Sequence, residues 1–193
     1  MNEAEIIQKL KARNENAFRQ LVENYQQLVV NTCFGLVHNT ADAEDIAQDV
    51  FIEVFRSVDK FRADSKISTW LYRIAVNRSL NFIRDNKRRK WFQSVEDALT
   101  SGKSGIMGTA LPKQENPDSV LENDQRAAML HKAIDSLPEN QKVAFTLSKY
   151  EELSYREIAG VMELSVSSVE SLIHRAKKNL QKKLYDCYKK NCL

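Results

Sequence analysis

The sequence is poor in residues that interrupt helices or cross-link chains. Its 193 residues include only 5 Gly, 3 Pro and 3 Cys. So few glycines and prolines argue against a loop-rich β architecture and favour helices. Cys33, Cys187 and Cys192 are odd in number and form no C-x-x-C pair. We therefore expect reduced thiols in a cytoplasmic protein, with no disulfide and no metal site.

The sequence also lacks a long apolar run. No stretch approaches the roughly 18 apolar residues that a membrane span requires. Residues 1–5 are acidic and carry no apolar segment of the kind that a signal peptide needs. We therefore expect no membrane insertion. Hydrophobic residues nevertheless make up 42% of the chain, which is enough for a packed core.

The net charge of +3 conceals alternating blocks. Residues 1–55 carry 4 Lys and Arg against 9 Asp and Glu (−5), whereas residues 56–90 carry 11 against 3 (+8). Residues 91–125 carry 2 against 6 (−4), and residues 126–193 carry 12 against 8 (+4). Two basic blocks predict two surfaces for polyanions, and leave the acidic faces for other contacts.

Apolar residues recur at helical spacing in the first half of the chain, and three helices are predicted there. They cover residues 15–38, 41–58 and 68–90. The second is the most regular, because its apolar residues follow the i, i+3, i+4 pattern for three turns. Asn39 or Thr40 can cap its first turn.

The periodicity is lost from residue 93 to residue 123. A Gly/Ser stretch followed by Pro112 and Pro117 predicts a flexible linker there. A segment of this length is too long for a loop inside a compact domain. We therefore predict an all-α fold of two small helical domains, residues 1–92 and 124–193, joined by this linker.

The second domain is predicted to contain four helices, of which the last two form a helix-turn-helix. The first two are expected over residues 124–136 and 138–149. Ser154 and Glu157 make a capping box that opens the third helix. After a short turn, Ser165 caps a longer fourth helix.

The fourth helix has the character of a helix that lies in a DNA groove. An inward apolar stripe is predicted at Val166, Val169, Leu172, Ile173, Ala176 and Leu180. Hydroxyl residues near a helix N-terminus permit close approach to bases and phosphates, and basic residues further along suit the DNA backbone. The residues predicted to face DNA are Ser165, Ser167, Ser168, Ser171, His174, Arg175 and Lys178. A helical hairpin with a solvated basic face is the alternative.

An acidic stripe marks the helix over residues 41–58. Asp42, Asp45, Asp49 and Glu53 share one face, backed by the apolar stripe. Such a face either docks on a basic partner helix or is simply solvated. No histidine or Gly-rich loop accompanies these carboxylates, so we do not expect acid–base or metal chemistry from them.

A basic stripe marks the next helix. Its members are spaced three or four residues apart and are Arg73, Asn77, Asn81, Arg84 and Arg88. Trp70 and Tyr72 lie near the start of the helix, and Phe61 lies in the preceding loop. Cations beside aromatic rings suit single-stranded nucleic acid, whose phosphates need neutralising and whose bases can stack. Trp70 and Phe61 could instead belong to the core.

Three segments in this order resemble the sigma-70 family of initiation factors. They are DAEDIAQDVFIEVFR from Asp42, ISTWLYRIAVNR from Ile67 and SYREIAGVMELSVSSVESLIHRAKKNL from Ser154. The size and the bare linker are similar to those of the extracytoplasmic-function group (group 4). The resemblance implies a factor that directs bacterial RNA polymerase core enzyme to specific promoters and helps to open the −10 region. It also implies a stress or envelope response controlled by an anti-sigma factor, with no cofactor and no small-molecule substrate.

The resemblance assigns a role to each part of the chain. The first domain is similar to region 2, which docks on the core polymerase and melts the −10 element. The second domain is similar to region 4, which binds the −35 duplex through the helix-turn-helix residues given above. The linker is then either an inert tether or an element inside the polymerase cleft. Polymerase contacts are implied for Asp42, Asp45, Gln48, Asp49 and Phe55. Contacts with the single-stranded −10 element are implied for Phe61, Lys66, Ser68, Thr69, Trp70, Arg73, Asn77, Arg84 and Arg88.

The recognition helix departs from the family pattern at Glu170 and Leu172, where basic residues are common. Glu170 could accept a hydrogen bond from a cytosine amino group or face away, so the preferred −35 sequence is not implied. Two other classes of protein use a helix-turn-helix. A free-standing repressor would need a dimer interface, and the sequence shows no heptad seam. A nucleic-acid enzyme would need a metal-ligand cluster, a P-loop or a nucleophile–base pair, and no such motif is present, so no catalytic residue is expected.

Overall fold

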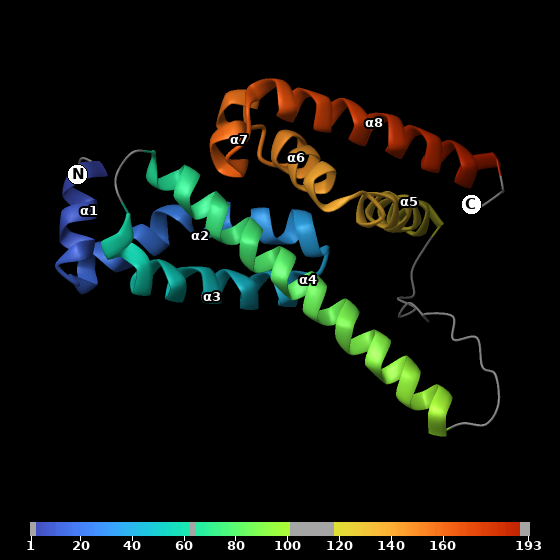
Figure 1. The fold of residues 1–193 in the computed structure, drawn as a ribbon, viewed down its shortest axis with the longest axis horizontal. Coiled ribbons are helices and arrows are strands. Elements are labelled where there is room, and N and C mark those ends of the chain that lie inside the picture. Colours follow the sequence, from blue (N-terminus) through green and yellow to red (C-terminus); the bar gives the residue numbers. More distant parts are fainter. Residues whose placement is uncertain (1–2, 62–64, 101–117, 190–193) are drawn as a thin grey trace.

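The computed structural model describes residues 3–61, 65–100 and 118–189. Within these ranges the chain forms eight α-helices and one short 3-10 turn, and contains no strand. The prediction of an all-α fold is confirmed. Figure 1 shows the helices as two groups that lie against each other.

The N-terminal domain is a bundle of three long helices with a short helix at one end. Its elements are α1 (Glu3–Lys11), α2 (Glu15–Val37), α3 (Thr40–Ser57), η1 (Val58–Lys60) and α4 (Ile67–Thr100). The bundle closes around a core that includes Leu21, Val29, Val50 and Leu71. Asn39 caps α3, because its side-chain oxygen accepts a hydrogen bond from the backbone N–H of Asp42 at 3.0 Å.

Helix α4 is longer than the sequence pattern predicts. It continues to Thr100, ten residues past the expected end at residue 90. The extension contains neither Gly nor Pro, and the first such residue is Gly102. Helix α5 begins at Asp118, immediately after Pro117. Residues 93–100 and 118–123 of the predicted linker are therefore helical, and the remainder lies outside the described residues.

The C-terminal domain contains the four predicted helices. They are α5 (Asp118–Asp135), α6 (Glu139–Lys149), α7 (Tyr155–Met162) and α8 (Val166–Lys189). The predicted capping box is present: Glu157 donates its backbone N–H to Ser154 Oγ at 3.3 Å, and the Ser154 N–H donates to Glu157 Oε2 at 3.0 Å. Glu163 turns the chain in the left-handed conformation, with φ 54°. Helices α7 and α8 therefore form the expected helix-turn-helix.

The inward stripe of α8 is confirmed except at its first position. Val169, Ile173, Ala176 and Leu180 are buried. Val166 was predicted to be buried with them, but its side chain is 45% exposed. It is the first residue of α8 and lies where the packed face ends, so helical periodicity alone overestimates its burial.

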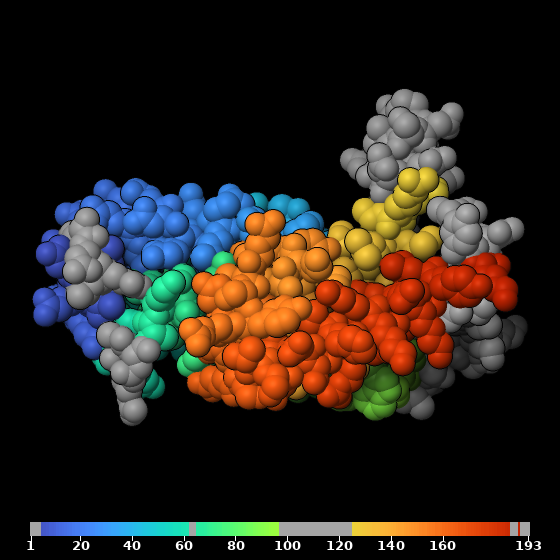
Figure 2. Space-filling view, turned by 90° about the horizontal axis from the view of Figure 1, so that it is seen from above, coloured from blue at the N-terminus to red at the C-terminus, as the bar shows by residue number. Residues whose placement is uncertain are grey.

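The two domains share a hydrophobic cluster that the sequence does not predict. Leu36, Tyr72 and Val76 of the N-terminal domain pack in one cluster with Leu147 and Ile158 of the C-terminal domain. Helices α4 and α7 are in contact, as are α2 and α6. Figure 2 shows the C-terminal domain, orange to red, lying directly on the N-terminal domain. We call this arrangement, in which the two domains pack against each other, the closed form.

A glycine permits the closest approach between the domains. A Cβ atom added to Gly35 of α2 would lie 2.8 Å from Thr146 Cγ2 of α6, which is too close for any real contact. The Thr146 hydroxyl instead donates a hydrogen bond to the Gly35 carbonyl at 3.3 Å. Gly35 therefore allows the two helix backbones to approach each other.

Candidate polymerase and nucleic-acid interfaces

The outer face of α3 presents most of the residues predicted to contact the polymerase. Asp45, Gln48, Asp49 and Phe55 are all exposed. Ile52 lies among them and is 47% exposed, although sequence reasoning did not select it. The missed signal was its spacing, three residues after Asp49 and three before Phe55. The face is therefore a mixed acidic and apolar surface, which suits docking better than acids alone.

Phe55 is held in place by neighbours from the start of the chain. Its ring packs edge-to-face with that of Phe18, with 5.3 Å between the centroids. The Arg13 guanidinium carbon lies 4.9 Å from the Phe55 ring centroid, and the same guanidinium donates to Asp59 Oδ2 at 2.6 Å. The exposed ring is thus fixed before any partner binds.

Two acidic residues of α3 lie away from that face. Glu53 Oε2 accepts a hydrogen bond from Arg78 of α4 at 2.7 Å, so this carboxylate serves the bundle. Asp42 is half-buried and lines a cleft between the two domains. The residues of the predicted acidic stripe therefore lie in three environments: Asp45 and Asp49 are exposed, Glu53 pairs with Arg78, and Asp42 lines the cleft.

The aromatic residues at the start of the basic stripe differ in exposure. Phe61 is only 6% exposed and belongs to the core of the N-terminal domain. Its ring lies against that of Trp70, which is half-buried, with 4.8 Å between the centroids. Of the two rings, Trp70 is the one that reaches the surface. Phe61 is available in this structure only as a support for Trp70.

Arg73 contacts the helix-turn-helix directly. Its Nη1 lies 2.8 Å from Glu163 Oε1, and its Nη2 donates to the Gly160 carbonyl at 2.8 Å. Asn77, Arg73 and Glu163 line a small pocket of about 160 Å³ between α4 and the C-terminal domain. Thr69 lies against Gly160, whose added Cβ would be 3.6 Å from Thr69 Cγ2. The closed form therefore covers the middle of the predicted −10 surface.

A second cation of the stripe is paired in the same way. Arg84 makes two hydrogen bonds to the Glu139 carboxylate, at 2.6 and 3.1 Å. This pairing raises the pKa of Arg84 and lowers that of Glu139. Carboxylates of the C-terminal domain thus pair with two arginines of the predicted −10 surface. Lys66 and Arg88, at the two ends of the predicted set, are exposed, and Ser68 is half-buried.

All seven predicted −35 residues are exposed on α8 or its cap. The Ser165 hydroxyl lies 2.8 Å from that of Ser168 and 3.1 Å from that of Ser167, and it accepts the Ser168 backbone N–H at 3.2 Å. Glu170 is exposed beside them, whereas Leu172 is half-buried. The structure therefore brings these side chains onto one open face, which the N-terminal domain does not cover.

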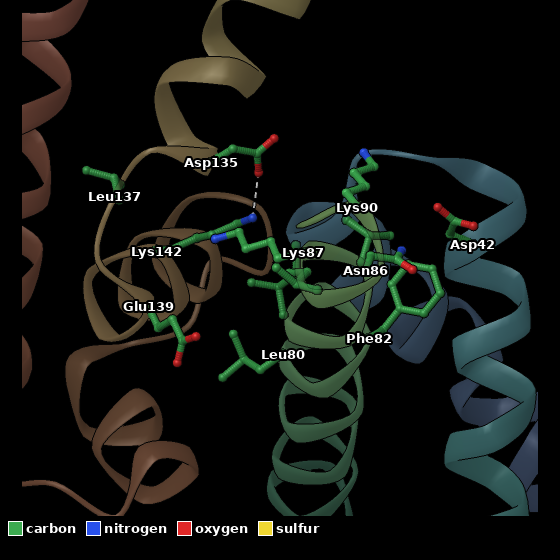
Figure 3. Close-up of a pocket in the computed structure, with 13 residues that line it drawn as sticks. Asp42, Leu80, Phe82, Asn86, Lys87, Lys90, Asp135, Leu137, Glu139 and Lys142 are labelled. Atoms are coloured by element: carbon green, nitrogen blue, oxygen red, sulfur yellow. Dashed lines mark hydrogen bonds and ion pairs between the residues drawn. The ribbon is translucent and has the colours of Figure 1, made fainter. Parts of the chain in front are cut away.

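A cleft of about 270 Å³ runs between the domains further along α4, and Leu80 lines both this cleft and the smaller pocket. Figure 3 shows Asp42 and Lys90 on the N-terminal side, and the Lys142–Asp135 pair, 2.6 Å apart, on the C-terminal side. Nearby, the buried Tyr72 hydroxyl donates to Glu151 Oε2 at 3.1 Å, and burial raises the pKa of that carboxyl. Sequence reasoning missed these polar contacts because their partners are far apart in the chain.

The described residues contain no group of three His, Cys, Asp or Glu side chains placed to hold a metal ion. No helix within them is long and apolar enough to cross a membrane. Cys33 is a free, buried thiol whose pKa burial raises to about 11. The side chain of Cys187 and the whole of Cys192 lie outside the described residues.

The fold defines a two-domain helical protein whose second domain is a helix-turn-helix. Residues 21–89 match the family model of sigma-70 region 2, and residues 127–180 match that of sigma-70 region 4. The chain is 35% identical over 181 residues to the RNA polymerase sigma-H factor of Pseudomonas aeruginosa, covering 93% of this chain and 92% of that one. It is 34% identical over 179 residues to the ECF RNA polymerase sigma-E factor of Escherichia coli K12, with 93% and 92% covered.

The structure of CnrH in complex with the cytosolic domain of CnrY has the same fold. The TM-score is 0.66 at 21% identity, with 95% of this chain and 97% of that chain covered. The chain belongs to the sigma-70 family of RNA polymerase sigma factors, in the extracytoplasmic-function group. It is a transcription initiation factor that directs bacterial RNA polymerase to promoters.

Proposed function

We propose that three separate surfaces carry this function, and that the protein acts without catalytic activity of its own in the cytoplasm. The face of α3 around Asp49 docks on the core polymerase. Lys66, just before α4, and the stripe of α4 as far as Arg88 bind the melted −10 element. The face of α8 from Ser165 to Lys178 binds the −35 duplex. The supporting observation is the simultaneous exposure of the α3 and α8 faces, on different domains.

The docking proposal is tested by charge reversal. Asp45→Arg/Asp49→Arg is expected to weaken binding to core enzyme at least about ten-fold, because two cations would then meet a surface selected for carboxylates. Binding is measured by labelled-protein titration with core enzyme, and run-off transcription is measured in parallel. Glu23→Arg reverses one charge at an exposed site of α2 and is the control. Unchanged transcription by the Asp45/Asp49 variant would show that α3 is not the docking face.

Ile52 extends the same proposal with a residue that carries no charge. Ile52→Ser is expected to weaken core binding several-fold, because an apolar side chain at the centre of an interface contributes more than one at its rim. Since Ile52 is already half in solvent, the free protein should lose little stability.

Promoter binding requires the closed form to open. By their names, the −10 and −35 elements are centred about 25 base pairs apart, which is about 85 Å of duplex at 3.4 Å per base pair. In the described structure Arg73 and the helix-turn-helix residue Glu163 are 2.8 Å apart. One duplex cannot reach both surfaces in this arrangement, so we infer that the closed form is the promoter-free state.

The closed form also suggests how the factor is held inactive. A relative of the same fold is bound by the cytosolic domain of another protein. We propose that an anti-sigma factor binds this chain and stabilises its closed form. The inhibitor should protect amides of α4 and α7 at the domain boundary from hydrogen exchange, and core enzyme should compete with it.

A free-standing repressor would use the same helix-turn-helix differently. It would bind a specific duplex as a dimer without polymerase. Run-off transcription over a promoter library distinguishes the two, because a sigma factor enriches linked −35 and −10 sequences only when core enzyme is present.

A further inference from the structure

The last turns of α4 form an exposed basic and aromatic surface. They project beyond α2 and α3 in Figure 1. Residues 84–92 carry five Lys and Arg against one Asp, a local charge of +4. Trp91 is 61% exposed and Phe92 is 57% exposed, and their rings meet edge-to-face with 5.1 Å between the centroids. Packing within the described residues does not explain why two large rings beside these cations are exposed to solvent.

These rings continue the basic stripe of the same helix. Arg88 follows Arg84 after four residues, and Trp91 and Phe92 follow Arg88 after three and four. On a helix this spacing places the side chains on one face. The aromatic pair therefore lies in line with the proposed −10 surface, at its distal end.

The two halves of the stripe differ in the closed form. Arg73 and Arg84 in the proximal half are paired with Glu163 and Glu139 of the C-terminal domain. In the distal half, Arg88 contacts Asp85 of its own helix at 3.1 Å, and both side chains remain more than half exposed. The distal end is thus the part of the stripe that a ligand can reach without opening the domains.

The chemistry of the distal end favours one class of ligand. The cations attract a polyanion, and an exposed indole can stack only on a base that is not already stacked in a duplex. A guanidinium one turn from the ring contacts the phosphate of the same nucleotide or the next. A protein partner would use the rings without needing so dense a positive charge.

We propose that Arg88, Trp91 and Phe92 form a binding site for single-stranded nucleic acid that remains accessible in the closed form. The site extends the proposed −10 surface, so its role in promoter opening rests on the proposed function. Binding of a single strand to the site does not itself require polymerase. A strand bound at this site lies next to the proposed −10 surface, which becomes exposed when the two domains separate.

The experiment uses the fluorescence of Trp91 in the full-length protein. The chain has two tryptophans, so Trp70→Phe leaves Trp91 as the single reporter. Titration with a 12-nucleotide oligo(dT) is expected to quench that emission by base stacking. Heparin supplies negative charge without bases and is expected to quench far less. Equal quenching by heparin, or none by oligo(dT), would overturn the proposal.

Matched variants test the geometry. Arg88→Ala and Phe92→Ala are expected to weaken oligo(dT) binding at least five-fold. Lys90→Ala removes the same charge from the same helix, but two residues after Arg88 and therefore from nearly the opposite side, and should change affinity less than two-fold. Equal losses for Arg88→Ala and Lys90→Ala would show that charge alone is responsible. Circular dichroism confirms that each variant remains helical.

The outcome separates this site from the proposed function. If oligo(dT) binding fails while the Asp45/Asp49 variant loses transcription as expected, only the distal site is wrong. If Trp91 responds to core enzyme and not to oligo(dT), the surface is a protein contact and the proposal is overturned.

Discussion

The guanidinium of Arg73 lies 2.8 Å from the carboxylate of Glu163, and this pair joins the two domains across the predicted DNA-binding surfaces. Arg73 belongs to the proposed −10 surface, and Glu163 forms the turn of the helix-turn-helix. A single contact thus covers an arginine of the proposed −10 surface and holds the turn of the helix-turn-helix against the N-terminal domain. Because each domain contributes one member of the pair, the domain interface can be tested by changing either Arg73 or Glu163.

The first prediction concerns this pair and its neighbour Arg84–Glu139. Glu163→Gln/Glu139→Gln removes the carboxylates that pair with Arg73 and Arg84 while keeping side-chain size. Both pairs are exposed to solvent, so each contributes only modestly to the closed form. The double variant should therefore shift the closed–open equilibrium several-fold toward the open form. Small-angle scattering measures the shift as a larger radius of gyration, and binding of a −10 oligonucleotide should tighten. Glu152→Gln/Glu170→Gln makes an equal charge change on exposed positions and should leave both unchanged.

The second prediction compares two glycines at the domain boundary. Gly35→Ala places a methyl group 2.8 Å from Thr146 Cγ2, so either the Thr146 side chain or one of the two helices must shift, at a cost of about 1–3 kcal/mol. Gly160→Ala meets Thr69 Cγ2 at an ordinary 3.6 Å and replaces a poor helix former inside α7. It should stabilise the protein by up to about 1 kcal/mol. Thermal unfolding measures both, and the two changes should have opposite signs. A stable, closed Gly35→Ala variant would contradict the close approach of α2 and α6.

The third prediction is a pH dependence of stability. His38 is buried and stacks on His131, with 4.1 Å between ring centroids, and Asp135 lies 3.4 Å from its Nε2. Burial lowers the pKa of His38 to about 4, despite the opposing effect of Asp135. The unfolded chain, with a pKa near about 6.5, then binds the proton first. The contribution of His38 to the free energy of unfolding is therefore fully present above about pH 6.5. It falls by up to about 3 kcal/mol as the pH drops toward 4.

His38→Asn tests this dependence. Asn tolerates the left-handed conformation that His38 adopts, with φ 56°, and does not titrate. Urea midpoints at pH 7 and pH 4.5 should differ less in this variant than in the parent chain. His174→Asn, at an exposed site of α8, should retain the full difference. An unchanged pH dependence in His38→Asn would assign the effect to other groups.

The fourth prediction separates stability from DNA contact in the helix-turn-helix. Ser154→Ala removes the cap of α7 and should lower stability by about 1 kcal/mol. Ser171 is exposed in the middle of the α8 face. Ser171→Ala should leave the melting temperature unchanged and weaken binding to the selected −35 duplex. A melting temperature lowered equally by both changes would show that Ser171 is part of the packing.

The sequence was sufficient where local periodicity decides the structure. The seven residues of α8 and its cap that are predicted to face DNA are exposed, because a capped amphipathic helix keeps its polar side outward. The pattern could not show that Phe61 would be covered, since its burial depends on packing against Trp70 and the bundle. It could not place Arg73 beside Glu163, because the two residues are ninety positions apart in the chain and leave no local signal for the contact. The role of each surface in transcription stays a prediction.

The extension of α4 sets where the chain leaves the first domain. The ten residues past residue 90 add about 15 Å of helix at 1.5 Å per residue. Because these residues are helical, both the distance and the direction of the exit are set by α4. Shortening this part of α4 by whole turns should therefore narrow the range of promoter spacings that the protein tolerates.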